Sequence, residues 1–326
     1  MWFEALTGFS EDEVEDVAAM FAISGDEITS TVNGRTMRVG RFETPTLGEL
    51  RQRAVDANGR SATLTLREVV ADAQALHREA AHSGAVFQVA SQFNTLEMVS
   101  PSVTPEAGID GYEHDRTQGP ACAVACGAGT IHRNYLVPVD GGIGQTATRQ
   151  IDCLADVATA LGVDLGMRNG YALPEAEELA RVADAVATMS EGDLDLVRAQ
   201  LRIGLQHETE VTLVGAGHTV TQAYCSAVPV AYSGLDPEMW EPFARLVLQA
   251  AYEATLAAAV VNVAATGNRT VFLTLLGGGV FGNPTSWITD AIARAAAVFA
   301  DTELDVAVVS YGRENPALSP LLADFD

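Results

Sequence analysis

The chain has 326 residues, of which 48% are apolar and 19% are charged, a composition typical of globular proteins rather than disordered or fibrous ones. Asp and Glu number 43 against 19 for Lys and Arg, which gives a formal charge of -24. A field of that sign repels nucleic-acid backbones and anionic lipid surfaces. We therefore expect neither a nucleic acid nor a membrane as a partner.

All 19 basic residues are arginines, because the sequence contains no lysine. This excludes chemistry that needs a lysine amine, such as Schiff bases, pyridoxal aldimines and the lysine-containing phosphate loop. Any phosphate group must then be held by backbone N–H groups, helix N-termini or arginine. The four cysteines and six histidines lack disulfide density and metal-ligand spacing, so we expect buried thiols, no metal site and no cofactor.

The N-terminal region is acidic at Ser10–Asp16, unlike the basic, apolar start of a signal peptide. The most apolar run, 254–265, is far shorter than the roughly 20 residues that span a bilayer. We expect a cytoplasmic protein, or an effector delivered by a route that needs no signal peptide. The sequence leaves the oligomeric state open.

Residues 1–60 form a predicted N-terminal extension, with a helix near 10–22 and β-forming residues at 27–41 around the turn signal Asn33-Gly34. The hydrophobic pattern then predicts a strand at 62–66, a helix at 68–81 and a buried strand at 86–90. This order implies a parallel strand pair.

Further along the chain, a polar loop at 99–119 precedes the remaining predicted elements. These are helices at 120–127, 147–161, 174–189, 193–205, 237–265 and 285–300, and strands at 210–213, 223–231, 270–276 and 304–310. Strands that alternate with helices predict an α/β fold, here one three-layer α/β/α domain over 61–326 with a mixed sheet and a helical insertion at about 140–210.

A glycine-rich loop follows the strand expected at 270–276, and a helix begins at Thr285 or Ser286. Three consecutive glycines allow close backbone approach to a ligand, and the free N–H groups of a helix start attract an anion. This is a phosphate cradle that needs no lysine. The alternative is a tight strand-to-helix turn whose glycines only serve packing.

The polar loop carries three carboxylates within six residues, at Asp110, Glu113 and Asp115. Paired carboxylates can activate water or protonate a leaving group. A solvated acidic loop is the alternative interpretation. His114 could act as an acid or base beside Asp115, or could be hydrogen-bonded for structural reasons. Because open α/β sheets bind ligands at the carboxyl ends of their strands, we expect the acidic loop and the glycine loop to share one crevice.

Three segments resemble the macrodomain family. Ser91–Asn94 lies where macrodomains carry an Asn-Ala-Ala-Asn strand end, Gly108–Gly111 resembles the Gly-Val-Asp-Gly of their first ligand loop, and Gly277–Pro284 resembles their Ser-Thr-Gly-Val-Phe-Gly-Phe-Pro phosphate loop. The resemblance covers roughly 60–139 and 210–312. It implies a macrodomain-like α/β/α fold that binds ADP-ribose.

The resemblance also implies roles for individual residues. Asn94 and Gln92 would contact the ligand at the strand end, and Asp110 would be the carboxylate beside the scissile bond, with Asp115 and Glu113 in support. The phosphate loop would bind the ligand through Gly278, Gly279, Val280, Phe281, Gly282 and Asn283. Adenine recognition would fall to Glu68 or Asp72, although the family's usual pattern is not kept there.

Longer phrases at Gln88–Met98, Tyr112–Thr130 and Gly144–Leu154 resemble a divergent macrodomain branch that includes a pathogen effector removing ADP-ribose from arginine. This implies a hydrolase of ADP-ribosylated protein, with arginine as the modified residue. Two alternatives remain: a module that only binds ADP-ribose, and a hydrolase of a small NAD-derived metabolite. The carboxylate cluster favours an enzyme, because binding alone does not need it.

Overall fold

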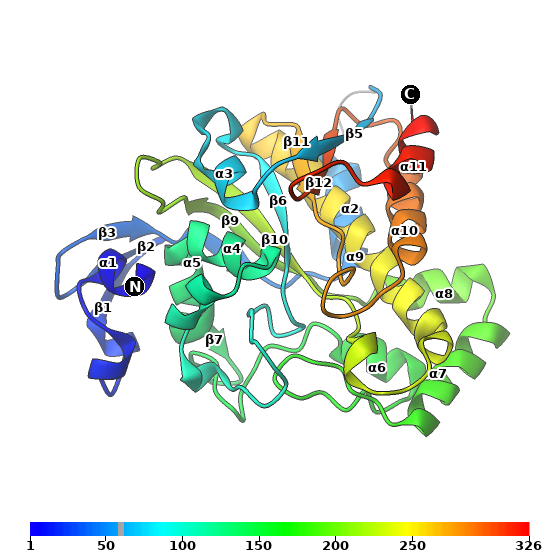
Figure 1. Cartoon of the computed structure of the whole chain (residues 1–326), viewed down its shortest axis with the longest axis horizontal. Coiled ribbons are helices and arrows are strands. Elements are labelled where there is room, and N and C mark those ends of the chain that lie inside the picture. The colour runs from blue at the N-terminus through cyan, green and yellow to red at the C-terminus, as the bar shows by residue number, and fades with distance from the viewer. Residues whose placement is uncertain (58–61, 326) are drawn as a thin grey trace.

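The computed structural model describes residues 1–57 and 62–325, and its centre is a seven-stranded sheet in the order β4-β9-β10-β6-β11-β12-β5 (Figure 1). Its strands are β4 Arg41–Glu43, β5 Thr65–Val70, β6 Val86–Ala90, β9 Gly204–Glu210, β10 Thr219–Cys225, β11 Thr270–Leu273 and β12 Asp305–Ser310. Neighbouring strands from β10 to β5 pair in parallel, whereas β9 pairs antiparallel with both β10 and the edge strand β4. The predicted mixed α/β/α class is confirmed.

Helices cover both faces of this sheet, because the inner strands alternate apolar side chains toward each face. Val271 joins the main core around the long helix α9, whereas Phe272 joins a second cluster with Leu76. One layer contains α2 Leu47–Ala57, α9 Pro237–Thr266 and α10 Thr285–Val298. The other contains α3 Ala73–Arg78, α4 Gln118–Ala125 and α5 Gly127–Ile131.

Helix α9 is long and apolar enough to cross a membrane by length and composition, and 83% of its most apolar window is buried inside the protein. It packs against α2, α7, α10 and the strands β6 and β10. Its apolar character therefore reflects its position in the core.

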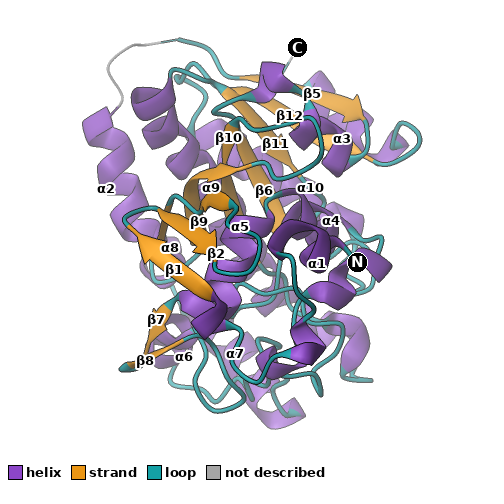
Figure 2. Ribbon diagram, turned by 90° about the vertical axis from the view of Figure 1, so that its left-hand side faces the viewer, coloured by secondary structure: helices purple, strands orange, loops and turns teal. Residues whose placement is uncertain are grey.

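The N-terminal region differs from the sequence prediction. Instead of a helix at 10–22, it forms short 3-10 turns at Glu11–Glu13 and Ala18–Met20. The Glu11 carboxylate accepts hydrogen bonds from the backbone of a distant loop. The closely spaced acidic side chains at 11–16 also disfavour a helix there, because like charges on one helix face repel. Helix α1 Trp2–Thr7 and a small sheet of β1 Phe21–Ser24, β2 Glu27–Ser30 and β3 Thr36–Arg38 complete this region (Figure 2).

The extension is also shorter than the first sixty residues, because β4 pairs with β9 in the main sheet and α2 packs on α9. Residues 58–60 of the predicted extension and residue 61 lie outside the described residues. The helix predicted from residue 68 is wrong at its start: β5 continues to Val70 through its pairing with β12, and Asp72 caps α3. Strand pairing has overridden the helical spacing there.

The insertion is helical only in its second part. Its elements are the hairpin β7 Pro138–Val139 with β8 Gly142–Ile143, and helices α6 Ala155–Leu161, α7 Ala176–Thr188 and α8 Glu191–Arg198. The helix predicted from residue 147 therefore begins eight residues later than expected. A short C-terminal helix, α11 Ser319–Ala323, packs near β5 and α10.

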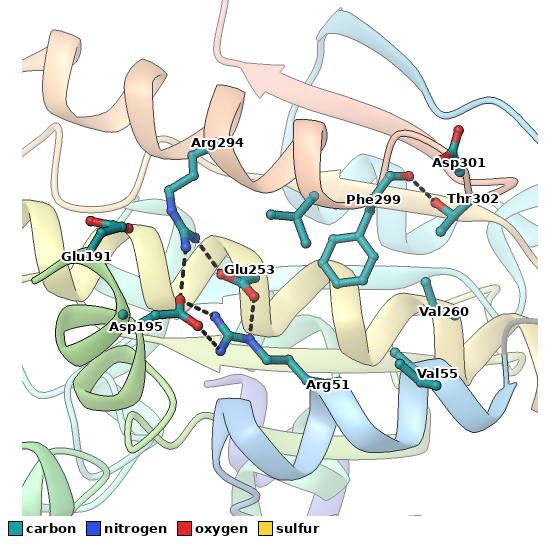
Figure 3. A pocket seen from close by; sticks show the side chains of 13 residues that line it. Arg51, Val55, Glu191, Asp195, Glu253, Val260, Arg294, Phe299, Asp301 and Thr302 are labelled. Carbon is teal, nitrogen blue, oxygen red and sulfur yellow. Dashed lines mark hydrogen bonds and ion pairs between the residues drawn. The ribbon is translucent and has the colours of Figure 1, made fainter.

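A buried ion network fastens the insertion to the helical layer of α2, α9 and α10 (Figure 3). Glu253 is 2% exposed, and its two oxygens accept hydrogen bonds from Arg51 Nε and Arg294 Nη1, each at 2.5 Å. Asp195 of α8 pairs with the same two arginines, at 2.7 Å from Arg51 and 3.2 Å from Arg294. The Glu253 carboxylate bridges the two guanidiniums and so joins α2, α9 and α10. The Asp195 carboxylate adds α8 to the network.

Replacing Glu253 with alanine is predicted to lower the free energy of unfolding by about 1.5–3 kcal/mol, because two partly buried guanidiniums lose a charged hydrogen-bond acceptor but keep Asp195 as a partner. The measurement is urea denaturation of the full chain. The matched control is Glu241→Ala on the same helix, which removes a carboxylate from the more exposed Arg245 pair and should cost less than about 1 kcal/mol. Equal effects of the two substitutions would contradict a special role for the buried bridge.

Candidate functional site

A cavity of about 480 Å³ opens at the carboxyl ends of β6, β10 and β11. Its walls come from the turn after β6, the start of α4 at 115–120, the segment after β10 and the glycine loop after β11. Tyr171 of the insertion and Tyr311 after β12 complete it. This is the edge of a parallel sheet where ligands bind, and its volume lies within the usual range of small-molecule sites. We refer to it below as the cleft.

A larger cavity of about 740 Å³ lies among α2, α8, α9 and α10 (Figure 3). The arginines and acids at its centre, Arg51, Asp195, Glu253 and Arg294, are paired with one another. Among residues 1–57 and 62–325, none that lines it follows a parallel strand. The cleft is therefore the better candidate for a binding site.

The glycine loop turns sharply where β11 ends. Gly277 has φ +71°, and a Cβ atom there would come within 2.5 Å of Ala227 Cβ and of Asn283 Nδ2. The Asn283 backbone N–H donates to the Gly277 carbonyl at 2.9 Å, and its side chain donates to the Val228 carbonyl at 2.9 Å. Glycine is thus required at 277 for both conformation and space. Asn283 braces the loop from behind rather than facing the cleft.

Tyr252 of α9 fixes the first part of the same loop. Its hydroxyl donates to the Thr274 carbonyl at 2.7 Å and accepts from the Leu276 N–H at 2.9 Å. Burial raises the pKa of Tyr252 well above its ordinary value, so the hydroxyl keeps the proton that it donates. The loop is therefore held from below by a fully buried side chain.

Three successive N–H groups at the tip of this loop, those of Gly279, Val280 and Phe281, donate to no protein acceptor in the described part of the chain. Gly279 has no atom within 4 Å of a built Cβ, and Val280 is 62% exposed. All three residues line the cleft, whereas Gly278 and Gly282 do not. A row of unpaired N–H groups at an open backbone position is the geometry that binds phosphate oxygens.

Aromatic side chains stand at two places along the cleft. Phe281, Tyr171 and Tyr232 pack mutually, with ring centroids 5.5–5.6 Å apart. Tyr311 is 81% exposed and stands apart from them after β12. Sequence analysis placed Phe281 in the site and missed the three tyrosines, because nothing in the insertion's pattern shows that Tyr171 returns to the sheet edge.

Of the three predicted catalytic carboxylates, Asp115 lines the cleft. It precedes α4, and its Oδ1 accepts a hydrogen bond from the Thr117 N–H at 2.8 Å. Gly119 lies two residues further, where a Cβ would come within 1.9 Å of the Ala90 carbonyl oxygen. The missing side chain of Gly119 lets α4 start directly against the end of β6, which brings Asp115 to the sheet edge.

Asp110 and Glu113 do not line the cleft, and the expectation that they act there beside Asp115 needs correction. The N-terminal segment holds their turn: Trp2 N donates to Glu113 at 2.9 Å, and Trp2 Nε1 donates to the Asp110 carbonyl at 3.1 Å. Glu11 accepts the Asp110 N–H at 2.8 Å from the same side. Burial raises the pKa of Asp110 above its ordinary value. The Glu113 carboxylate and the backbone of Asp110 thus contact the N-terminal segment, while Asp110 Oδ1 is buried without a hydrogen-bond partner in the described residues.

The polar residues after β6 brace their own turn. Asn94 is fully buried, donates to Gln150 at 2.9 Å and accepts from the Leu96 N–H at 3.1 Å. Gln92 lines the cleft, and its side-chain oxygen accepts from the Met98 N–H. Gln92 is therefore placed for ligand contact, while Asn94 lies behind it.

The two candidates for adenine recognition also lie outside the cleft. Glu68 accepts the Asn315 N–H at 2.7 Å, and Asp72 caps α3 through the Ala75 N–H. Both carboxylates are engaged in local structure.

Sequence analysis missed Glu97, a carboxylate that lines the cleft and is 2% exposed. Its nearest cation is Arg133, fully buried, with Nη2 at 3.4 Å from Glu97 Oε1. Burial raises the pKa of Glu97 to about 7, although Arg133 lowers it. The only signal was a single acid between Leu96 and Met98, an apolar setting in which an acid is costly unless paired.

No protein-family model matches the sequence, and no curated protein matches it. Among solved structures, the chain is similar to poly(ADP-ribose) glycohydrolase from Thermomonospora curvata, with 13% identity over 92% of this chain and 94% of that chain, at a TM-score of 0.46. It is also similar to the enzyme from Deinococcus radiodurans in complex with ADP-ribose, with 13% identity over 87% and 91% of the two chains, at a TM-score of 0.45. Likeness at this level carries no conclusion about family or activity.

Alanine is predicted to be tolerated at position 279 and not at position 277. Gly277→Ala should lower the free energy of unfolding by about 1–3 kcal/mol, because it forces a left-handed conformation on a residue whose Cβ has no space. Gly279→Ala should leave stability within about 0.5 kcal/mol of the wild type. Urea denaturation measures both, and a larger loss for Gly279→Ala would show that the tip of the loop is not open.

Proposed function

We propose that the protein hydrolyses the bond between ADP-ribose and a modified protein, with arginine as the modified residue. The observation that carries this proposal is one cleft holding both the unpaired N–H groups of 279–281 and the carboxylate of Asp115. The N–H groups can bind a diphosphate, and the carboxylate can activate water for attack on a glycosidic carbon. The sequence resemblance to macrodomains supports the same substrate.

The diphosphate would bind at the tip of the glycine loop, where three backbone N–H groups are free to donate and no lysine is needed. Helix α10 begins at Thr285 directly after this loop, so the positive end of its dipole adds to the attraction. Tyr311 presents an exposed ring on which adenine can stack. The packed rings of Phe281, Tyr171 and Tyr232 then bound the distal ribose.

The chemistry follows from the bond to be broken. An N-glycoside of arginine reacts through an oxocarbenium-like state at the anomeric carbon, and water must be held against that carbon as the guanidine leaves. Asp115 is only partly buried, and one of its oxygens is oriented by the Thr117 N–H. Its other oxygen can orient the water and accept its proton.

A module that only binds ADP-ribose is the second candidate. It is favoured by the placement of Asp110 and Glu113 outside the cleft, which leaves Asp115 as the one member of the predicted cluster there. Binding without release from any linkage would identify such a module.

The Gly279→Leu substitution is predicted to weaken ADP-ribose binding at least about 100-fold, because the new side chain occupies the face where the diphosphate meets the loop. Isothermal titration calorimetry with ADP-ribose measures the effect. Gly192→Leu is the matched control, because only Ser190 Oγ, at 3.7 Å, approaches a Cβ there and the residue lies outside the cleft. Unchanged affinity in Gly279→Leu would place the ligand elsewhere.

The Asp115→Asn substitution is predicted to lower kcat on ADP-ribosyl-arginine substrate by about 10²–10⁴-fold while ADP-ribose affinity changes little. Asparagine keeps the acceptor for the Thr117 N–H, so the start of α4 is preserved. Asp110→Asn is the control and should retain kcat within about threefold, in line with its contacts to the N-terminal segment. A large loss of kcat in Asp110→Asn, with kcat nearly unchanged in Asp115→Asn, would instead assign the catalytic role to Asp110.

A further inference from the structure

One carboxylate oxygen of Glu97 has a hydrogen-bond partner, and the other has none in the described residues. Oε1 lies 3.4 Å from Arg133 Nη2, while Oε2 is buried and has no partner among residues 1–57 and 62–325. A carboxylate oxygen buried without a donor is costly, so its retention calls for a reason. Because Glu97 lines the cleft, a group bound there can supply the missing donor.

The same molecule shows what completes such a carboxylate. Glu253 is equally buried, and each of its oxygens accepts from a different arginine, Arg51 on Oε1 and Arg294 on Oε2 (Figure 3). Glu97 has the first half of this arrangement, with Arg133 on Oε1. No second guanidinium contacts Oε2 in the described residues, and Glu97 lines the cleft.

Arg133 is held in place by other contacts and donates to only one of the two carboxylate oxygens of Glu97. Its Nε donates to the Thr95 carbonyl at 3.0 Å, its Nη1 donates to the Tyr224 hydroxyl, and the guanidinium lies 3.6 Å from the centre of the Tyr224 ring. These contacts fix the guanidinium plane toward Tyr224. Glu97 Oε2 is therefore left for another donor.

We propose that Glu97 Oε2 receives the guanidinium of the substrate arginine, so that Glu97 bridges Arg133 and the substrate as Glu253 bridges Arg51 and Arg294. This inference rests on the proposed function and adds the residue that selects the arginine linkage. A serine- or glutamate-linked ADP-ribose has no cation to place there and leaves the oxygen unpaired. Discrimination thus comes from a buried group that only one substrate class satisfies.

The electrostatics around Glu97 agree with this role. Arg133 is the cation paired with it, and the titratable groups around it include Tyr112, whose hydroxyl accepts the Glu97 N–H at 3.1 Å, Tyr224 and Cys122. Asp115 and Arg116 line the same cleft. Burial raises the pKa of Glu97 to about 7, so near neutral pH the empty site is partly protonated. A bound guanidinium favours the ionised form, and affinity for it must rise as the pH increases through about 7.

The test uses ADP-ribosyl-agmatine, a substrate whose leaving group is a guanidine without protein contacts. Glu97→Gln keeps the shape and removes the charge, and it should raise KM for this substrate by about 10–150-fold, the value of one charge-assisted hydrogen bond. Affinity for free ADP-ribose should stay within about threefold of wild type, which also shows that the variant is folded. Wild-type KM should fall between about pH 6 and about pH 8, and the variant should lose that dependence.

A second measurement needs only the wild-type chain. Agmatine should bind to the protein saturated with ADP-ribose, more tightly at about pH 8 than at about pH 6. Absence of agmatine binding, or an unchanged KM in Glu97→Gln, would overturn the inference while ADP-ribose binding and hydrolysis stand. Failure of the wild type to bind ADP-ribose would instead overturn the proposed function, and the inference with it.

Discussion

The left-handed turn at Gly277 is the constraint on which the site depends. It lies four residues after the end of β11, and the bonds from Asn283 and Tyr252 hold the loop whose N–H groups at 279–281 have no protein partner in the described residues. In a chain without lysine, those N–H groups and the start of α10 are anion-binding elements at the sheet edge, where Arg116 also lines the cleft. Every proposal about the ligand follows from this arrangement of backbone.

The acidic groups near the cleft differ in environment, and that difference separates their roles. Asp115 is half-buried at the start of α4, Asp110 is turned to the N-terminal segment, and Glu97 is enclosed beside Arg133. A partly solvated carboxylate suits work on water, while an enclosed one suits recognition of a cation. The N-terminal segment then acts as a brace: by fastening the turn at 109–113, it fixes where the following residues reach the sheet edge.

Sequence reasoning located the layers and the cleft because long apolar runs and glycine spacing are local signals. Strands β6, β11 and β12, helix α9 and the loop at 277–283 follow from such runs, whereas β9 and β10 begin earlier than the strands predicted at 210–213 and 223–231. Asp115 lies in the predicted acidic loop and lines the cleft. The differences at the acidic loop depend on contacts between distant segments, since Trp2 bonds to the backbone of Asp110 from more than one hundred residues away along the chain. No local sequence pattern marks Glu97 or Tyr171 as a site residue, and only the fold brings them to the cleft.

The central claim is that a diphosphate binds to the backbone N–H groups at 279–281. Amide resonances of the ¹⁵N-labelled protein, followed during titration with ADP-ribose, test it most directly. The account predicts large downfield shifts of the Gly279, Val280 and Phe281 amides, with Tyr311 responding and the amides around Glu253 unchanged. Shifts centred on the α2–α9–α10 cavity, with the glycine-loop amides unmoved, would contradict it.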